Sequence, residues 1–263
     1  MRSHFSKRAA AALVLAALLC PLAAIAQPAA YLKGAPTWEQ NDTGISGIWK
    51  MQGYVGSTHP VRERVAKTID GKLPPMLPWA SELLEKRLTD AEHDKIFANT
   101  AARCLPEGVP YIMFSAVSGP IQILETPEQV TIISEEMNED WFIHLNVPHE
   151  KDVEPSFHGE SVGHWEGSTL VVDTVGLSDR TTLDQVGMPH TMALHVVTRI
   201  RRTDAQTLEF LVNIDDPKTF SAPWSRRVIY KKAKAGERIA EDVCENQRNG
   251  INSEGFQSFQ INH

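Results

Sequence analysis

The chain of 263 residues contains neither a phosphate-binding glycine loop nor a dinucleotide fingerprint, so nucleotide-dependent enzymes find no support in it. It also lacks an HExxH motif, a CxxC pair and a His-x-His triplet, which are compact spacings that present two ligands to one transition metal. No repeat of fixed period is present, which argues against solenoids and propellers. We therefore predict neither a cofactor nor a bound metal.

Basic residues are also in the minority. The chain has 26 Lys and Arg against 33 Asp and Glu, a formal net charge of -7. An acidic surface disfavours binding to nucleic acid and to anionic membranes. We therefore expect a small-molecule ligand or substrate as the partner, whereas the sequence carries no signal for an oligomeric state.

The first residues have the composition of a targeting segment. Lys7 and Arg8 precede an apolar, alanine-rich run that ends in small residues just before Gln27, a pattern typical of a cleaved signal peptide. We predict that residues 1–26 are removed and that the mature protein is periplasmic or secreted, without stable membrane association. An uncleaved N-terminal anchor is the alternative interpretation.

Cysteine is scarce, and of the three residues only Cys104 and Cys244 follow the predicted cleavage point. An even pair in an oxidising compartment is most simply explained by one disulfide that closes a long loop. We therefore predict a Cys104–Cys244 disulfide, with two free buried thiols as the alternative. Neither residue lies in a recognisable nucleophile context.

Hydrophobic periodicity predicts a mainly β protein with one helical insertion. From Gly119 onward, short runs alternate apolar and polar residues and are joined by turn residues, which is typical of an antiparallel meander. Residues 75–100 instead carry leucines at helical spacing. Residues 27–45 lack periodicity and are predicted to be an extended lead-in. We predict one β-barrel domain over residues 46–263, with the helical insertion at about 75–100.

The triplet Gly47-Ile48-Trp49 at the start of the first predicted strand is similar to the Gly-x-Trp opening of lipocalin-like barrels. The resemblance implies an antiparallel lipocalin-like β-barrel in which a buried Trp49 closes one end.

From Trp49 to Cys244 the chain resembles a widespread family of exported bacterial proteins to which no reaction is assigned. The segments that carry the resemblance are PPMLPW, RCLPEGVP, SVGHWEGSTLVVDT, GMPHTMALHVVTRIRR, NIDDPKTFSAPW and VCENQ. Members of the family usually carry acidic residues at the positions of Ser168 and Thr198, and His158 is not part of their pattern. The resemblance therefore favours His190 and His195 as functional histidines.

Histidine is the abundant reactive residue, with six between His144 and His195. Zinc and copper favour such ligands, so a His-rich metal-binding protein is one hypothesis. On one strand, however, His158 and His164 would lie roughly 20 Å apart and could not share an ion. His158 and Glu160 share a strand face and could edge one pocket.

General acid–base chemistry is the hypothesis that we favour. About nineteen residues between Thr174 and Leu194 show no regular element, and such long loops in compact domains are often functional. An acid–base site needs a titrating group, a partner that orients it and a pocket poor in water. The predicted catalytic residues are His190, His195, Asp184, Asp173 and Glu160. The predicted ligand-binding residues are Tyr111, Trp141, His158 and Arg199.

Two other motifs resemble catalytic signatures but do not fit them. Ser161 lies in Gly-x-Ser-x-Gly, but a second strand follows where a nucleophile elbow needs a helix, so we predict a small inward-facing residue. Asp215 and Asp216 are adjacent on a strand and point to opposite faces, so they cannot act as a facing pair. A turn cap explains them better.

These observations predict an exported barrel protein that binds a small, largely apolar molecule at the barrel mouth. In the catalytic version it converts that molecule as a lyase, isomerase or hydrolase. In the alternative version it is a non-catalytic periplasmic carrier. The catalytic version requires a histidine within hydrogen-bond reach of a carboxylate in a pocket poor in water.

Overall fold

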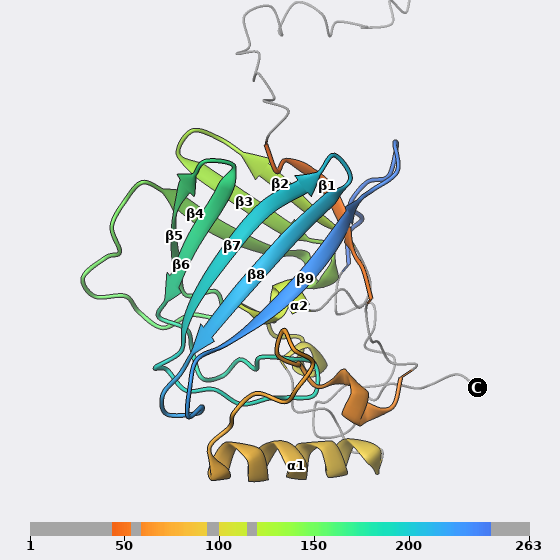
Figure 1. Cartoon of the computed structure of the whole chain (residues 1–263), viewed down its shortest axis with the longest axis vertical. Helices are drawn as coiled ribbons and strands as arrows, with labels where there is room; N and C mark the ends of the chain where they lie inside the picture. The colour runs from red at the N-terminus through yellow and green to blue at the C-terminus, as the bar shows by residue number, and fades with distance from the viewer. Residues whose placement is uncertain (1–43, 54–58, 94–99, 115–119, 243–263) are drawn as a thin grey trace, which may run out of the picture. The chain divides into compact units, whose positions relative to one another are not determined.

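The computed structural model describes residues 44–53, 59–93, 100–114 and 120–242 (Figure 1). The predicted signal peptide and nearly all of the predicted lead-in lie outside these residues. Within them, no helix has both the length and the apolar character needed to cross a membrane.

The described residues form a closed barrel of nine strands, which confirms the predicted mainly β barrel. The strands are β1 (Gly47–Met51), β2 (Ile121–Glu125), β3 (Gln129–Ser134), β4 (Glu139–Leu145), β5 (Glu160–Glu166), β6 (Thr169–Val175), β7 (His195–Asp204), β8 (Thr207–Asp215) and β9 (Trp224–Lys232). Consecutive strands are neighbours, and β1 closes the barrel against β9.

One pairing departs from the predicted antiparallel order. β4 and β5 run parallel, with His144 opposite Val162 and Leu145 opposite Gly163. A parallel pair needs a long connection because the chain must return to the same end of the sheet. Residues 146–159 provide it, and this excursion lies on the outside of the barrel wall.

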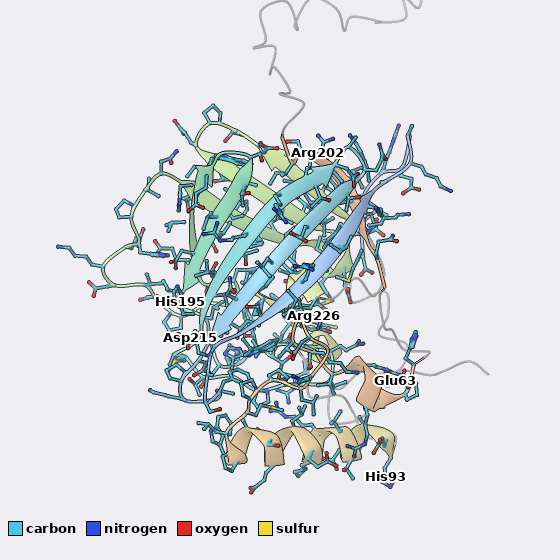
Figure 2. The ribbon with its side chains drawn as sticks, in the orientation of Figure 1. Glu63, His93, His195, Arg202, Asp215 and Arg226 are labelled. Carbon is cyan, nitrogen blue, oxygen red and sulfur yellow. The ribbon has the colours of Figure 1, made fainter. Side chains whose placement is uncertain are left out.

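The core follows the two-residue alternation of the strands. On β7, Val196 and Ile200 are buried, and on the paired β8 so are Phe210 and Val212. Trp49 is completely buried, and its indole N–H donates to the carbonyl of Ile45 at 2.9 Å. Figure 2 shows Arg202, whose guanidinium lies 6.0 Å from the Trp49 ring centroid, at the upper end of the barrel.

The interior of the barrel is filled by protein. The short helix α2 (Tyr111–Phe114) is buried throughout, and the Tyr230 hydroxyl donates to the Met113 carbonyl at 3.2 Å. Gly108, just before α2, has φ +71°, and a Cβ there would come within 2.0 Å of the Phe157 carbonyl oxygen. A side chain at this position would therefore displace the segment that fills the barrel.

The predicted helical insertion is α1 (Pro78–Glu92), which lies beyond the lower end of the barrel in Figure 1. Proline at its first turn suits a helix start, and its buried positions are Ala80, Leu84, Leu88 and Ala91. Three short 3-10 helices complete the described elements: η1 (Val61–Arg64), η2 (Ala101–Arg103) and η3 (Glu136–Asn138).

Candidate functional site

Three of the five predicted catalytic residues meet on the outer face of the barrel. Glu160 on β5, Asp173 on β6 and His195 on β7 all point outward, and a fourth residue, His149 of the 146–159 connection, joins them. His195 Nε2 lies 2.8 Å from Asp173 Oδ1. His149 Nε2 lies 3.2 Å from the same oxygen, and His149 Nδ1 lies 2.7 Å from Glu160 Oε2. The result is a continuous chain of alternating carboxylates and imidazoles.

The chain runs from a shielded end to an exposed end. The side chain of Glu160 is 18% exposed and that of His149 is 27% exposed, whereas Asp173 and His195 are each 42% exposed. Burial opposes the charged form of Glu160, but the Glu150 backbone N–H and the His149 ring together hold the pKa of Glu160 below its usual range. Glu160 is therefore ionised at neutral pH.

Glu160 also lines a cavity of about 450 Å³ on the outer side of β4 and β5, which we call the outer cavity. Its walls are formed by Asp140, Phe142, His144, Glu150, Val153, Glu154, Ser156, His158, Gly159, Glu160 and Ser161. His158 and Glu160 both line this cavity, but the predicted shared strand face is wrong, because β5 begins at Glu160 and His158 lies in the segment before it.

A buried carboxylate holds His158 in this wall. Glu139 at the start of β4 is only 4% exposed, and its Oε2 lies 3.0 Å from His158 Nε2. The carboxylate also accepts the backbone N–H groups of Glu107 and Gly108. An ionised carboxylate only accepts hydrogen bonds, so an ionised Glu139 requires an N–H at His158 Nε2. Among the described residues, Nδ1 of His158 has no hydrogen-bond partner.

His190 and Asp184, the two predicted catalytic residues from the long loop, lie apart from this network. His190 is 5% exposed, with Nδ1 3.0 Å from the Thr191 carbonyl and Nε2 2.6 Å from the Thr181 hydroxyl. Burial lowers its pKa, so the ring is neutral and its contacts organise the loop.

Asp184 is buried, and it accepts the backbone N–H groups of Ala66, Val186 and Met188 at 2.8 to 3.1 Å. Desolvation raises its pKa, although these hydrogen bonds oppose the shift. Asp184 therefore ties the long loop to the segment that precedes α1.

The other predicted ligand-binding residues lie outside the outer cavity. Tyr111 is buried in α2, and Trp141 is 1% exposed, with its indole N–H donating to Ser161 Oγ at 2.7 Å. Ser161 thus faces inward, as predicted. Arg199 points outward and pairs with Glu166 at 2.7 Å. Asp216 accepts the Lys218 backbone N–H at 3.1 Å, which is the predicted turn cap.

Two further expectations concern cysteines and metals. Cys244 lies outside the described residues, so the Cys104–Cys244 disulfide stays a prediction. In the described part of the chain, no group of three or more His, Cys, Asp or Glu side chains converges to hold a metal ion.

Sequence reasoning missed His149 and Glu139, the two residues that organise the histidine and carboxylate contacts. His149 lies in a connection without periodicity, and nothing local marks it. Glu139 could have been found, because it shares an inward face with Trp141 and Ile143 on β4, and a buried acid in such a series needs partners.

No protein-family model, no curated protein sequence and no solved structure matches this chain at a significant level.

Proposed function

We propose that the protein is an exported acid–base enzyme that converts a small molecule in the outer cavity, with His158 as the group that takes up and returns the proton. The observation that carries the proposal is the His158–Glu139 pair in the cavity wall. A histidine oriented by a buried, hydrogen-bonded carboxylate is the arrangement that general base catalysis needs.

The protonation states follow from the contacts. In this proposal Glu139 accepts a hydrogen bond from His158 Nε2–H, which leaves the Nδ1 lone pair of the neutral ring available to a bound substrate. When Nδ1 takes a proton, the imidazolium forms next to the buried carboxylate, which stabilises it. The same ring then returns the proton to the product or to a leaving group. Lyase, isomerase and hydrolase reactions all use such a step.

The walls of the cavity define the class of substrate. Four carboxylates line it, at Asp140, Glu150, Glu154 and Glu160. They repel anions, so the substrate is neutral or cationic. Phe142, which is 50% exposed, and Val153 supply apolar surface for its body.

The linked side chains of Glu160, His149, Asp173 and His195 lie on the outer face of the barrel, and Glu160 is the member that lines the cavity. His149 Nδ1 faces the Glu160 carboxylate and His149 Nε2 faces that of Asp173, so the ring links the two carboxylates. The chain thereby holds the Glu160 charge in one orientation and links it to the surface at His195. In this proposal His195 acts through its neighbours.

The test is a turnover screen of neutral and cationic small esters, lactones and hydroxy compounds, followed by mass spectrometry. His158→Gln is expected to lower the rate for any converted compound by about 100- to 10,000-fold. His164→Gln is the matched control, because His164 lies on β5, is 56% exposed and does not line the cavity. Full turnover in a folded His158→Gln protein would contradict the proposal.

A non-catalytic carrier is the second candidate function, and a second cavity at the barrel mouth favours it. That cavity is lined by residues of β1, β9 and the loops that cover the barrel end.

A further inference from the structure

The side chain of Arg226 faces the inside of the barrel near one of its ends. Along β9, Trp224, Val228 and Tyr230 face inward and are buried, and the two-residue alternation places Arg226 on the same face. The guanidinium carbon of Arg226 lies 4.6 Å from the ring centroid of Phe114, the last residue of α2. Figure 2 shows Arg226 near the end of the barrel opposite Arg202.

The charge of Arg226 is poorly neutralised. Within the described residues it has no hydrogen bond and no ion pair, whereas its outward neighbour Arg227 pairs with Glu209 at 3.1 Å. Desolvation lowers the pKa of Arg226, and the charge of Asp184 only partly opposes this. Asp184 is itself committed to three backbone N–H groups. A desolvated guanidinium without a partner is costly unless an anion joins it.

Arg226 lines a cavity of about 470 Å³, which we call the mouth cavity. Its apolar walls come from Met51, Val65, Ile69, Phe114, Val228 and Ile229. Arg64, Lys67 and Arg227 add positive charge, while Glu63 and Asp184 add negative charge. The cavity therefore combines apolar surface with one guanidinium that lacks a partner.

We propose that the mouth cavity binds a small organic monocarboxylate, with its carboxylate on Arg226 and its apolar body against Phe114 and Val228. The planar guanidinium presents parallel N–H groups that match a carboxylate in a bidentate pair. Glu63 and Asp184 disfavour a dianion such as phosphate. This site is separate from the outer cavity and does not depend on the proposed catalysis there.

Calorimetric titration of the full chain with octanoate and benzoate, and with octanol and benzyl alcohol as uncharged counterparts, tests the proposal. We expect saturable binding of at least one carboxylate, with the matching alcohol roughly ten- to hundredfold weaker. This comparison uses the native protein and needs no variant. Equal affinity for acid and alcohol, or no saturable binding of any probe, overturns the proposal.

Variants then locate the site. Arg226→Gln is expected to weaken carboxylate binding by roughly ten- to hundredfold, and Arg226→Lys to give an intermediate loss because it keeps the charge without the fork. Arg201→Gln, which removes an outward-facing arginine that pairs with Glu209 and does not line the cavity, is the control and should bind as the native protein does. Inorganic phosphate should bind more weakly than the carboxylates. Unchanged affinity in a folded Arg226→Gln protein overturns the assignment.

Discussion

The two cavities of this barrel are similar in volume, about 450 Å³ outside β4 and β5 and about 470 Å³ at the mouth, but they differ in chemistry. The outer cavity combines carboxylates with histidines, and histidine is the side chain whose ordinary pKa lies near neutral pH. The mouth cavity is built around Arg226, a permanent cation that cannot take part in proton transfer. The comparison assigns the proposed proton transfer to one cavity and the proposed anion binding to the other.

The same contrast distinguishes two histidines. His158 is held by the carboxylate of Glu139 in a cavity wall, with Nδ1 unoccupied among the described residues. His190 has both ring nitrogens engaged by Thr181 and Thr191 and is almost completely buried. Contact with a carboxylate and access to a cavity, rather than burial alone, mark the histidine that can work as a base.

The largest expected effect comes from removing the charge that orients His158. Glu139→Gln leaves the ring without an anionic partner and presents an amide N–H to backbone donors, so turnover should fall by about 100-fold or more. Glu128→Gln changes an exposed carboxylate that does not line the cavity and is the control. Initial rates measured alongside circular dichroism separate catalysis from folding. A folded Glu139→Gln protein with native rates would remove the basis for the proposed role of Glu139.

The next largest effect is on the free energy of unfolding, through Asp184 in the wall of the mouth cavity. Asp184→Asn keeps the shape but turns one acceptor into a donor, so a backbone N–H among those of Ala66, Val186 and Met188 loses its partner. The free energy of unfolding should fall by about 1–3 kcal/mol. Urea titration measures it, with the exposed Asp140→Asn as the control.

The pH dependence of this effect has a definite sign. Because the folded-state pKa of Asp184 is raised, its contribution to stability is fully present below the ordinary carboxyl pKa and is lost as pH rises through the raised value. The Asp184→Asn protein should lack this loss. An identical pH slope in both proteins would show that Asp184 does not titrate as described.

A smaller effect is expected from His195→Gln. His195 is half exposed and acts on the outer cavity only through Asp173 and His149, so its loss should lower turnover by about fivefold or less. Comparison with His158→Gln under the same conditions measures the difference. A loss from His195→Gln as large as that from His158→Gln would move the proton-transferring role to the exposed end of the chain.

The smallest effect concerns Glu160 in acid. Its folded-state pKa is lowered, so its contribution to stability is present above the ordinary glutamate pKa and is lost as pH falls through the lowered value. Thermal unfolding of Glu160→Gln should therefore show a flatter pH dependence in the acid range than the native protein. Glu166→Gln is unsuited as a control because an ion pair with Arg199 lowers its pKa too, whereas Glu150→Gln changes an exposed neighbour.

The barrel was predictable because strand alternation is local. The alternation of apolar and polar residues from Gly119 onward predicted antiparallel pairs such as that of β7 and β8. This conclusion needs only the neighbours of each residue along the chain. The predicted shared strand face of His158 and Glu160 was wrong, because β5 begins at Glu160, although both residues line the outer cavity.

The assembly of the site was not predictable in the same way. Asp173 lies opposite Val197, which brings it beside His195, and that register is a property of the closed sheet. His149 arrives on a connection whose length is explained only by the parallel pairing of β4 and β5. The buried α2 segment occupies the barrel interior. The predicted catalytic residues His190 and Asp184 instead make contacts within the covering loops, away from the histidine and carboxylate network.

The orientation of His158 by Glu139 is the central claim, and nitrogen-15 NMR of histidine-labelled protein tests it most directly without requiring a substrate. Assignment by comparison with His158→Gln identifies the two ring nitrogens of His158. The account predicts that the neutral ring carries its proton on Nε2, with Nδ1 unprotonated, and that Glu139→Gln weakens this preference. A neutral ring protonated on Nδ1, or a tautomer that Glu139→Gln does not change, would contradict it.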